Sequence, residues 1–267
     1  MSDVFNFKRF GKFFSYDLNN AKSSFGLSLL IMSMMPVILF FFNELFSFIF
    51  SGSFAQLDIN AKTFCFICCF WVLALVAPSK MYGQLTDKRK GSDWILIPAS
   101  SLEKSLSMII MLCLVAPFVF FAVYFGADFL MASFFPGTYG NTITEDRSGV
   151  IFNLIKTDSM EIQLGKSMLS RYAGLCLLIL SFALGALCFK KNKVGKTILC
   201  WFALTIVLSM IIVFIFGHNL SFTSDDYNRL FFSLTPEQIR LILWSCTGLA
   251  IIGLMTAIYF RIKTIKH

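Results

Sequence analysis

The sequence predicts an all-α, polytopic membrane protein with six transmembrane helices. Apolar residues make up 57% of the chain, 33 residues are Phe, and only 14% are charged, whereas an ordinary soluble domain has roughly 25% charged residues. Most of the apolar residues fall in blocks of about twenty, the length needed to cross roughly 30 Å of hydrocarbon at about 1.5 Å per helical residue. This composition excludes a soluble globular fold.

Six apolar blocks follow one another along the chain. The second is the shortest, so its ends are the least well defined by the pattern. Pro36 and Pro117 lie inside the first and third blocks, where a missing backbone N–H favours a kink. We expect transmembrane spans at 25–50, 63–77, 106–134, 169–189, 197–216 and 239–260.

The distribution of Lys and Arg predicts the orientation, because basic residues stay on the cytoplasmic side of short loops. The N-terminus, the second and fourth loops and the C-terminal tail hold 16 of the 23 basic residues and 5 of the 15 acidic ones, a net charge of +11. The opposite face holds 7 basic and 10 acidic residues, a net charge of −3. We therefore expect both termini in the cytoplasm, and we attribute the basic charge to anionic membrane lipids rather than to nucleic acid.

The first 24 residues are polar, basic and aromatic, and they contain no signal-peptide pattern. One helical stripe carries Phe side chains and Leu18, with basic residues largely off it, which predicts an amphipathic helix at the inner membrane interface. The alternative is an ordinary basic flank of the first span, and Gly11 weakens the helix. The expected membrane-interface residues are Phe7, Lys8, Arg9, Phe10, Lys12 and Phe14.

The cytoplasmic segment 78–105 is too long and too patterned for a simple turn. Its first part, 81–90, is compatible with a short helix, and 94–98 is apolar. Ser100 and Glu103 have the spacing of a capping box that begins the third transmembrane helix. The outward loops 135–167 and 218–236 suggest no chemistry, although Pro236 at the end of the second has the pattern of a capped helix start. Residues 1–24 and 25–267 therefore form an interfacial segment and one membrane domain.

Motifs for bound nucleotides or metals are incomplete. Gly165-Lys166-Ser167 and Gly195-Lys196-Thr197 lack the earlier glycine of a phosphate-binding loop, because Met160 and Lys190 occupy that position. Cys65, Cys68 and Cys69 lie in a predicted span without enough further ligands for a structural zinc site, and apolar packing explains them better. We expect no catalytic residue, no metal and no cofactor on this chain.

Two acidic residues, Glu44 and Asp128, fall inside the predicted spans. An intramembrane ionisable group is a candidate for function, but both lie toward the outer ends of their spans, where charges at the interface or at a pore mouth are equally compatible. The centres of the spans lack ionisable residues. A proton- or sodium-coupled transporter usually needs such groups, so any transport would take its energy from another subunit.

The order of these parts resembles the permease subunit of ABC-2 type transporters, which has an N-terminal interfacial helix, six spans, cytoplasmic ends and a cytoplasmic loop between the second and third spans. The stretches YGQLTDKRKG at 82–91 and LIPASSLEK at 96–104 are similar to that loop in permease-like membrane proteins of Bacteroidetes. One departure is that the largest outward loop here lies between the third and fourth spans, whereas that family often places its re-entrant elements between the fifth and sixth.

The resemblance implies a permease subunit in a bacterial inner membrane that dimerises with itself or with a second permease. It also implies a separate cytoplasmic ABC ATPase, which would bind ATP and Mg²⁺, and a lipid-like, peptide or drug-like cargo. The loop would dock on that ATPase, although a solvated charged face is an equal alternative for its charged residues. The implied partner-binding residues are Tyr82, Leu85, Asp87, Lys88, Arg89, Lys90, Glu103 and Lys104.

Two other classes of function remain open. The chain could be a membrane partner that does not transport, such as an assembly, anchoring or immunity factor, in which case the same loop binds something other than an ATPase. An intramembrane enzyme needs convergent polar groups, and the presence of only two His, His218 and His267, makes this the weakest class.

Overall fold

Every regular element that the structure describes is a helix or a helical turn. A computed structural model of the chain describes residues 5–54, 56–86, 96–143, 168–217 and 236–264, and no strand occurs within these ranges. The all-α class predicted from the sequence is confirmed. The elements are α1 (Phe7–Ser33), α2 (Met35–Ser51), α3 (Ile59–Tyr82), the 3₁₀ turn η1 (Gly83–Thr86), α5 (Ser101–Ile110), the π-helical segment η2 (Met111–Val115), α6 (Ala116–Phe134), α8 (Met168–Cys188), α9 (Lys193–Gly217) and α11 (Pro236–Thr264).

Three helical segments are long and apolar enough to cross a membrane, namely Ile59–Thr86, Ser101–Phe134 and Trp244–Thr264. Two bent pairs raise the number to as many as five if each pair is one span. The pair Phe7–Ser33 and Met35–Phe50 bends by 43°, and the pair Tyr172–Cys188 and Lys193–Val207 bends by 120°. The chain is therefore a membrane protein by length and composition, but six separate spans are not confirmed within the described residues.

The break between α1 and α2 falls at Met34, just before Pro36. Proline cannot donate the backbone hydrogen bond that a continuous helix requires at this position, so the predicted disruption near Pro36 is confirmed. The helix α1 runs through the expected boundary at residues 24 and 25 and continues to Ser33. Its most buried side chains include Phe13 and Asp17, whereas Phe7 and Leu18 of the predicted apolar stripe are 82% and 42% exposed.

Pro117 has a second consequence, in the long helix formed by α5, η2 and α6. Because proline has no N–H, the Cys113 carbonyl loses its usual donor four residues later. The helix widens into the π-helical segment η2 immediately before this proline. The Tyr172 hydroxyl of α8 donates a hydrogen bond to the Cys113 carbonyl, so a partner from another helix satisfies the group that proline leaves free.

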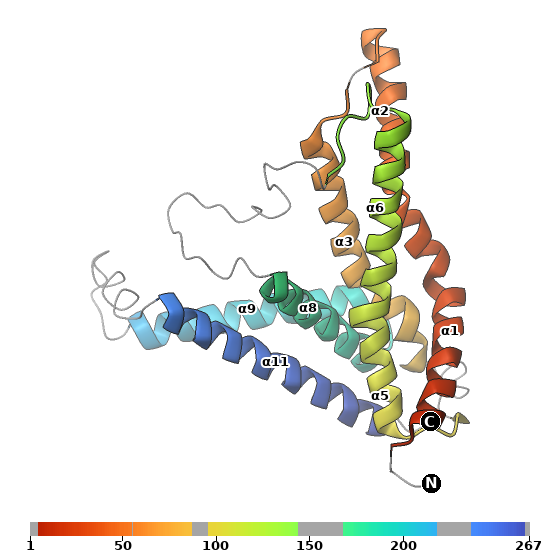
Figure 1. The fold of residues 1–267 in the computed structure, drawn as a ribbon. Helices are drawn as coiled ribbons and strands as arrows, with labels where there is room; N and C mark the ends of the chain where they lie inside the picture. The colour runs from red at the N-terminus through yellow and green to blue at the C-terminus, as the bar shows by residue number, and fades with distance from the viewer. Residues whose placement is uncertain (1–4, 55, 87–95, 144–167, 218–235, 265–267) are drawn as a thin grey trace.

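The helices run in two directions (Figure 1). The elements α1, α2, α3 and α6 lie along one long axis, and α8, α9 and α11 leave it at a steep angle. Apolar side chains from α1, α3, α5, α6, α8 and α11 form one core, in which Met108, Phe120, Leu180 and Ile258 are fully buried.

The first turn of α1, the start of α5 and the last turn of α11 lie at the same end of the molecule (Figure 1). We call this the loop end, and it also includes η1 and the turn 189–192 between α8 and α9. Segment 87–95 of the predicted coupling loop lies outside the described residues.

Candidate partner-binding site at the loop end

The described part of the predicted partner-binding set is buried. Tyr82 is 2% exposed, Leu85 6%, Glu103 0% and Lys104 7%. Asp87, Lys88, Arg89 and Lys90 lie outside the described residues, so their contacts are not assigned. All four side chains lie inside the chain in this conformation. Tyr82 and Glu103 hold the two flanks of the loop, as their hydrogen bonds show.

Asp17 of α1 joins both flanks of the loop. This carboxylate is 1% exposed, and a buried carboxylate requires hydrogen-bond donors. The Tyr82 hydroxyl, at the end of α3, donates to Asp17 Oδ2 at 2.7 Å. The Ser107 hydroxyl of α5 donates to the same oxygen, also at 2.7 Å. The helix before the loop and the helix after it are therefore fixed to one acceptor on α1.

Glu103 ties the far flank of the loop to the beginning of α1. Its backbone N–H donates to Ser100 Oγ at 3.2 Å, and its carboxylate accepts the Ser100 N–H at 2.9 Å, so the predicted capping box is confirmed. Arg9 donates to both carboxylate oxygens, each at 2.7 Å. The Asn6 N–H adds a fourth donor at 2.9 Å. This two-pronged arginine–carboxylate geometry is the strong form of ion pair.

Lys193 ties the near flank of the loop to the start of α9. Its ammonium donates to the Gly83 carbonyl and, at 2.6 Å, to the Thr86 hydroxyl. A cation is favourable there, because the carbonyls at the C-terminal end of α3 carry a partial negative charge. On the other side of the turn, Arg261 Nε of α11 donates to the Leu187 carbonyl in the last turn of α8 at 3.3 Å. The turn 189–192 is thus held between two helices.

The exposed charge at the loop end is positive. Among the described residues there, the carboxylates are Asp17 and Glu103, and both are buried and hydrogen bonded. The lysines, in contrast, mostly reach solvent or lipid. Lys8, Lys12, Lys22, Lys80, Lys190, Lys191, Lys196 and Lys263 are exposed. A partner that meets this surface is expected to present negative charge.

The expected membrane-interface residues of α1 divide into two groups. Phe7, Lys8 and Lys12 are exposed. Phe10 and Phe14 are half-buried and stack on each other, with ring centroids 5.9 Å apart. Arg9 is also half-buried and belongs to the Glu103 ion pair. The exposed group remains compatible with a membrane surface, whereas Arg9 has a structural partner inside the protein.

The intramembrane acid Asp128 is a structural residue in this fold. It is 1% exposed and accepts hydrogen bonds from the Tyr139 hydroxyl and the Ile143 N–H. Lys62, which is 2% exposed, donates to the carbonyls of Tyr139 and Asn141 at 2.6 and 2.9 Å. Its ammonium also lies 3.6 Å from the centre of the Tyr139 ring. These contacts fasten the segment after α6 to α3 and α6.

Glu44 on α2 has a different environment. One of its carboxylate oxygens, Oε1, is buried and has no hydrogen-bond partner. The helix around it exposes large apolar side chains, including Phe42 at 64% and Phe46 at 54%. Glu44 therefore keeps the character of an intramembrane polar group, with one carboxylate oxygen unpaired.

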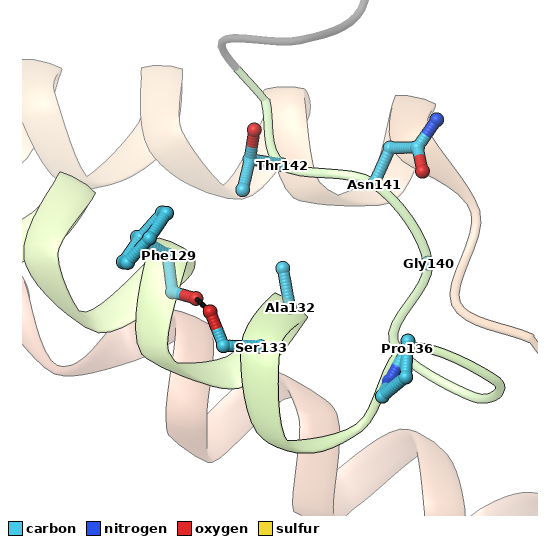
Figure 2. Close-up of a pocket in the computed structure, with 7 residues that line it drawn as sticks. All are labelled: Phe129, Ala132, Ser133, Pro136, Gly140, Asn141 and Thr142. Atoms are coloured by element: carbon cyan, nitrogen blue, oxygen red, sulfur yellow. Dashed lines mark hydrogen bonds between the residues drawn. The ribbon is translucent and has the colours of Figure 1, made fainter.

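A small pocket of about 160 Å³ lies beside the fastened segment (Figure 2). Its polar wall includes Ser133, Asn141 and Thr142, but the Ser133 hydroxyl already donates to the Phe129 carbonyl at 2.8 Å.

The described residues contain no group of three His, Cys, Asp or Glu side chains that could hold a metal ion. In the predicted cysteine cluster, Cys69 is buried, Cys65 half-buried and Cys68 exposed, all as free thiols.

Sequence reasoning missed Asp17, Ser107 and Lys193. Asp17 is the one acidic residue between Val4 and Asn43, and a lone acid inside a basic amphipathic segment was a signal that could have identified it. Ser107 and Lys193 carry no such signal.

No protein-family model matches the chain, and no curated protein or solved structure is significantly similar to it.

Proposed function

We propose that this chain is the membrane-spanning permease subunit of an ATP-driven ABC exporter. In this proposal it forms a dimer, couples through segment 78–105 to a separate cytoplasmic ATPase, and binds no nucleotide itself. The support from the structure is a membrane protein by composition whose candidate coupling loop is anchored on both flanks. The family assignment rests on the resemblance of the loop and of the order of helices.

The observation that carries the proposal is the shared acceptor Asp17. A force applied to the loop would reach α1 from α3 through Tyr82 and from α5 through Ser107, because both hydroxyls donate to the same carboxylate oxygen of Asp17. The Glu103 and Lys193 contacts extend this connection to the beginning of α1 and to the start of α9. Coupling between sites requires such contiguous contacts among elements that can move together.

The test is affinity purification of the tagged full-length chain in mild detergent, with partners identified by mass spectrometry. The wild type is compared with the triple variant Asp87→Ala, Lys88→Ala, Arg89→Ala. A matched control carries Lys156→Ala and Lys166→Ala, which remove basic residues from the predicted outward loop 135–167. We expect an ABC ATPase to co-purify with the wild type and the control and to be lost from the triple variant.

A second measurement tests whether ATP hydrolysis by the partner depends on this subunit. The purified pair is reconstituted in liposomes, and ATP hydrolysis is compared for the wild type and for Asp17→Ala, which removes the shared acceptor. We expect hydrolysis to respond to the wild-type subunit and the response to fall in the variant. If no ATPase co-purifies with an intact wild-type chain, the proposal fails, and a membrane partner without transport activity becomes the better reading.

A further inference from the structure

We propose that the turn between α8 and α9, together with the exposed face of α9, is a binding site for an anionic phospholipid. The headgroup would meet Lys190, Lys191 and Lys196, which we call the turn lysines. The acyl chains would lie along the apolar surface of α9. This inference does not depend on the proposed transport function.

The turn lysines form a positive surface in a stretch of sequence that lacks acidic residues. All three are exposed, and the sequence contains no Asp or Glu between Glu161 and Asp225. The ammonium of Lys196 lies 5.9 Å from the centre of the Phe189 ring, which places it over the turn. Each lysine near a membrane surface attracts anionic headgroups, so three exposed lysines favour a phosphate-bearing, negatively charged headgroup over a neutral one.

The position of the turn is fixed by a fourth lysine that points the other way. Lys193 is bound to the Gly83 carbonyl and the Thr86 hydroxyl, so it belongs to the protein interior and not to the site. On the α8 side, the Trp201 indole N–H donates to the Ser181 hydroxyl at 3.0 Å. The residue Thr197 is buried against Gly185. These contacts pack α9 against α8 and leave Lys196 exposed.

The face of α9 that carries Lys196 continues as an apolar strip. Leu199, Val207 and Met210 follow Lys196 at helical spacing on this face, and they are 69%, 54% and 67% exposed. The strip from Lys196 to Met210 is about 21 Å long at 1.5 Å per residue, which exceeds the roughly 15 Å of one leaflet's hydrocarbon. Figure 1 shows α9 leaving the axis of α1, α2 and α6.

The combination favours a lipid over a protein partner. A soluble protein that docks on the lysines would leave the exposed apolar strip beside them uncovered. A phospholipid satisfies both parts at once, since its charged headgroup and its acyl chains are joined in one molecule, as Lys196 and the apolar strip adjoin on α9.

Trp201 provides a direct probe because it lies on α9 near the site. The full-length chain with Trp71→Phe, Trp94→Phe and Trp244→Phe keeps Trp201 as its single tryptophan. It is reconstituted in phosphatidylcholine bilayers that contain increasing amounts of brominated phosphatidylglycerol or brominated phosphatidylcholine, and quenching of Trp201 fluorescence gives the relative binding constant. We expect phosphatidylglycerol to bind roughly five- to tenfold better than phosphatidylcholine.

Two variants decide whether the turn lysines are responsible. Lys190→Gln, Lys191→Gln, Lys196→Gln is expected to reduce the preference to about one. The matched control Lys8→Gln, Lys12→Gln, Lys22→Gln removes the same charge from α1 and is expected to keep the preference. Equal quenching by the two lipids, or an equal loss in both triple variants, would overturn the proposal.

A second readout covers the case in which the single-tryptophan protein does not fold. Native mass spectrometry of the chain with its four natural tryptophans, released from detergent with added phosphatidylglycerol, counts bound lipids directly. We expect at least one phosphatidylglycerol that survives detergent removal and that the turn-lysine variant loses. Retention of the same lipid count by that variant would contradict the site.

Discussion

Tyr82 and Asp17 lie 65 positions apart in the chain, and the hydroxyl of the first donates a hydrogen bond of 2.7 Å to the carboxylate of the second. Both side chains are almost completely buried, at 2% and 1% exposure. Ser107 donates to the same oxygen from α5. The three residues therefore act as a unit, and their mutational effects are expected to be non-additive.

Asp17→Ala should destabilise the chain by about 2–4 kcal/mol, because it leaves two buried hydroxyls without their acceptor. Tyr82→Phe alone should cost about 1 kcal/mol. Thermal unfolding in detergent, followed by near-ultraviolet circular dichroism, measures both. When Tyr82→Phe is added to Asp17→Ala it should cost clearly less than it does alone, and full additivity would show that the two side chains do not interact.

Arg9→Ala should lower the unfolding temperature, because it leaves the buried Glu103 carboxylate without its cation. The half-exposed position of Arg9 keeps the loss below that of a completely buried pair. Lys8→Ala, one residue away on the exposed side of α1, is the control and should change stability by less than about 0.5 kcal/mol. Equal effects of the two substitutions would show that the Arg9–Glu103 ion pair does not stabilise the loop end.

Gly185→Ala should separate α8 from α9. A methyl group at position 185 would lie 2.0 Å from the Thr197 hydroxyl oxygen, so either the helices move apart or Thr197 rotates, at a cost of about 1–3 kcal/mol. Gly174→Ala on the same helix is the matched control, because nothing lies within 4 Å of its new methyl group. That control should be neutral or stabilising by up to about 1 kcal/mol.

Tyr172→Phe should cost about 1–3 kcal/mol, because it removes the donor that satisfies the Cys113 carbonyl. The reason for this dependence is Pro117, which cannot supply the ordinary helical N–H. In a Pro117→Ala background the helix regains a donor, and the same tyrosine substitution should cost less. A double-mutant cycle measures the difference. An unchanged cost in the alanine background would mean that Tyr172 acts through packing alone.

The two intramembrane acids should respond differently to neutral substitutions. Asp128→Ala removes the acceptor for Tyr139 and for the Ile143 N–H, so segment 135–143 should become sensitive to limited proteolysis and the protein should lose about 2–4 kcal/mol. Glu44→Gln should change stability by less than about 0.5 kcal/mol, since its Oε1 has no partner to lose. Comparable proteolysis of both variants would contradict this contrast.

Local features of the fold were predictable because their causes are local. The capping box at Ser100 and Glu103 and the helix that begins at Pro236 occur where the sequence predicts them. The break before Pro36 follows from the missing backbone donor. The number of spans was less predictable, because apolar length does not distinguish a straight span from two helices that meet at a bend of 43° or 120°.

The sequence by itself determined a helical membrane protein with a basic end, because composition and helical length are properties of neighbouring residues. Only the tertiary structure decided that Tyr82 and Glu103 point inward and that Asp17 receives donors from 65 and 90 positions away. A buried carboxylate must find donors somewhere, but the side chains that supply them depend on which helices meet. The packing of the whole chain determines which helices meet, and the sequence near Asp17 does not specify them.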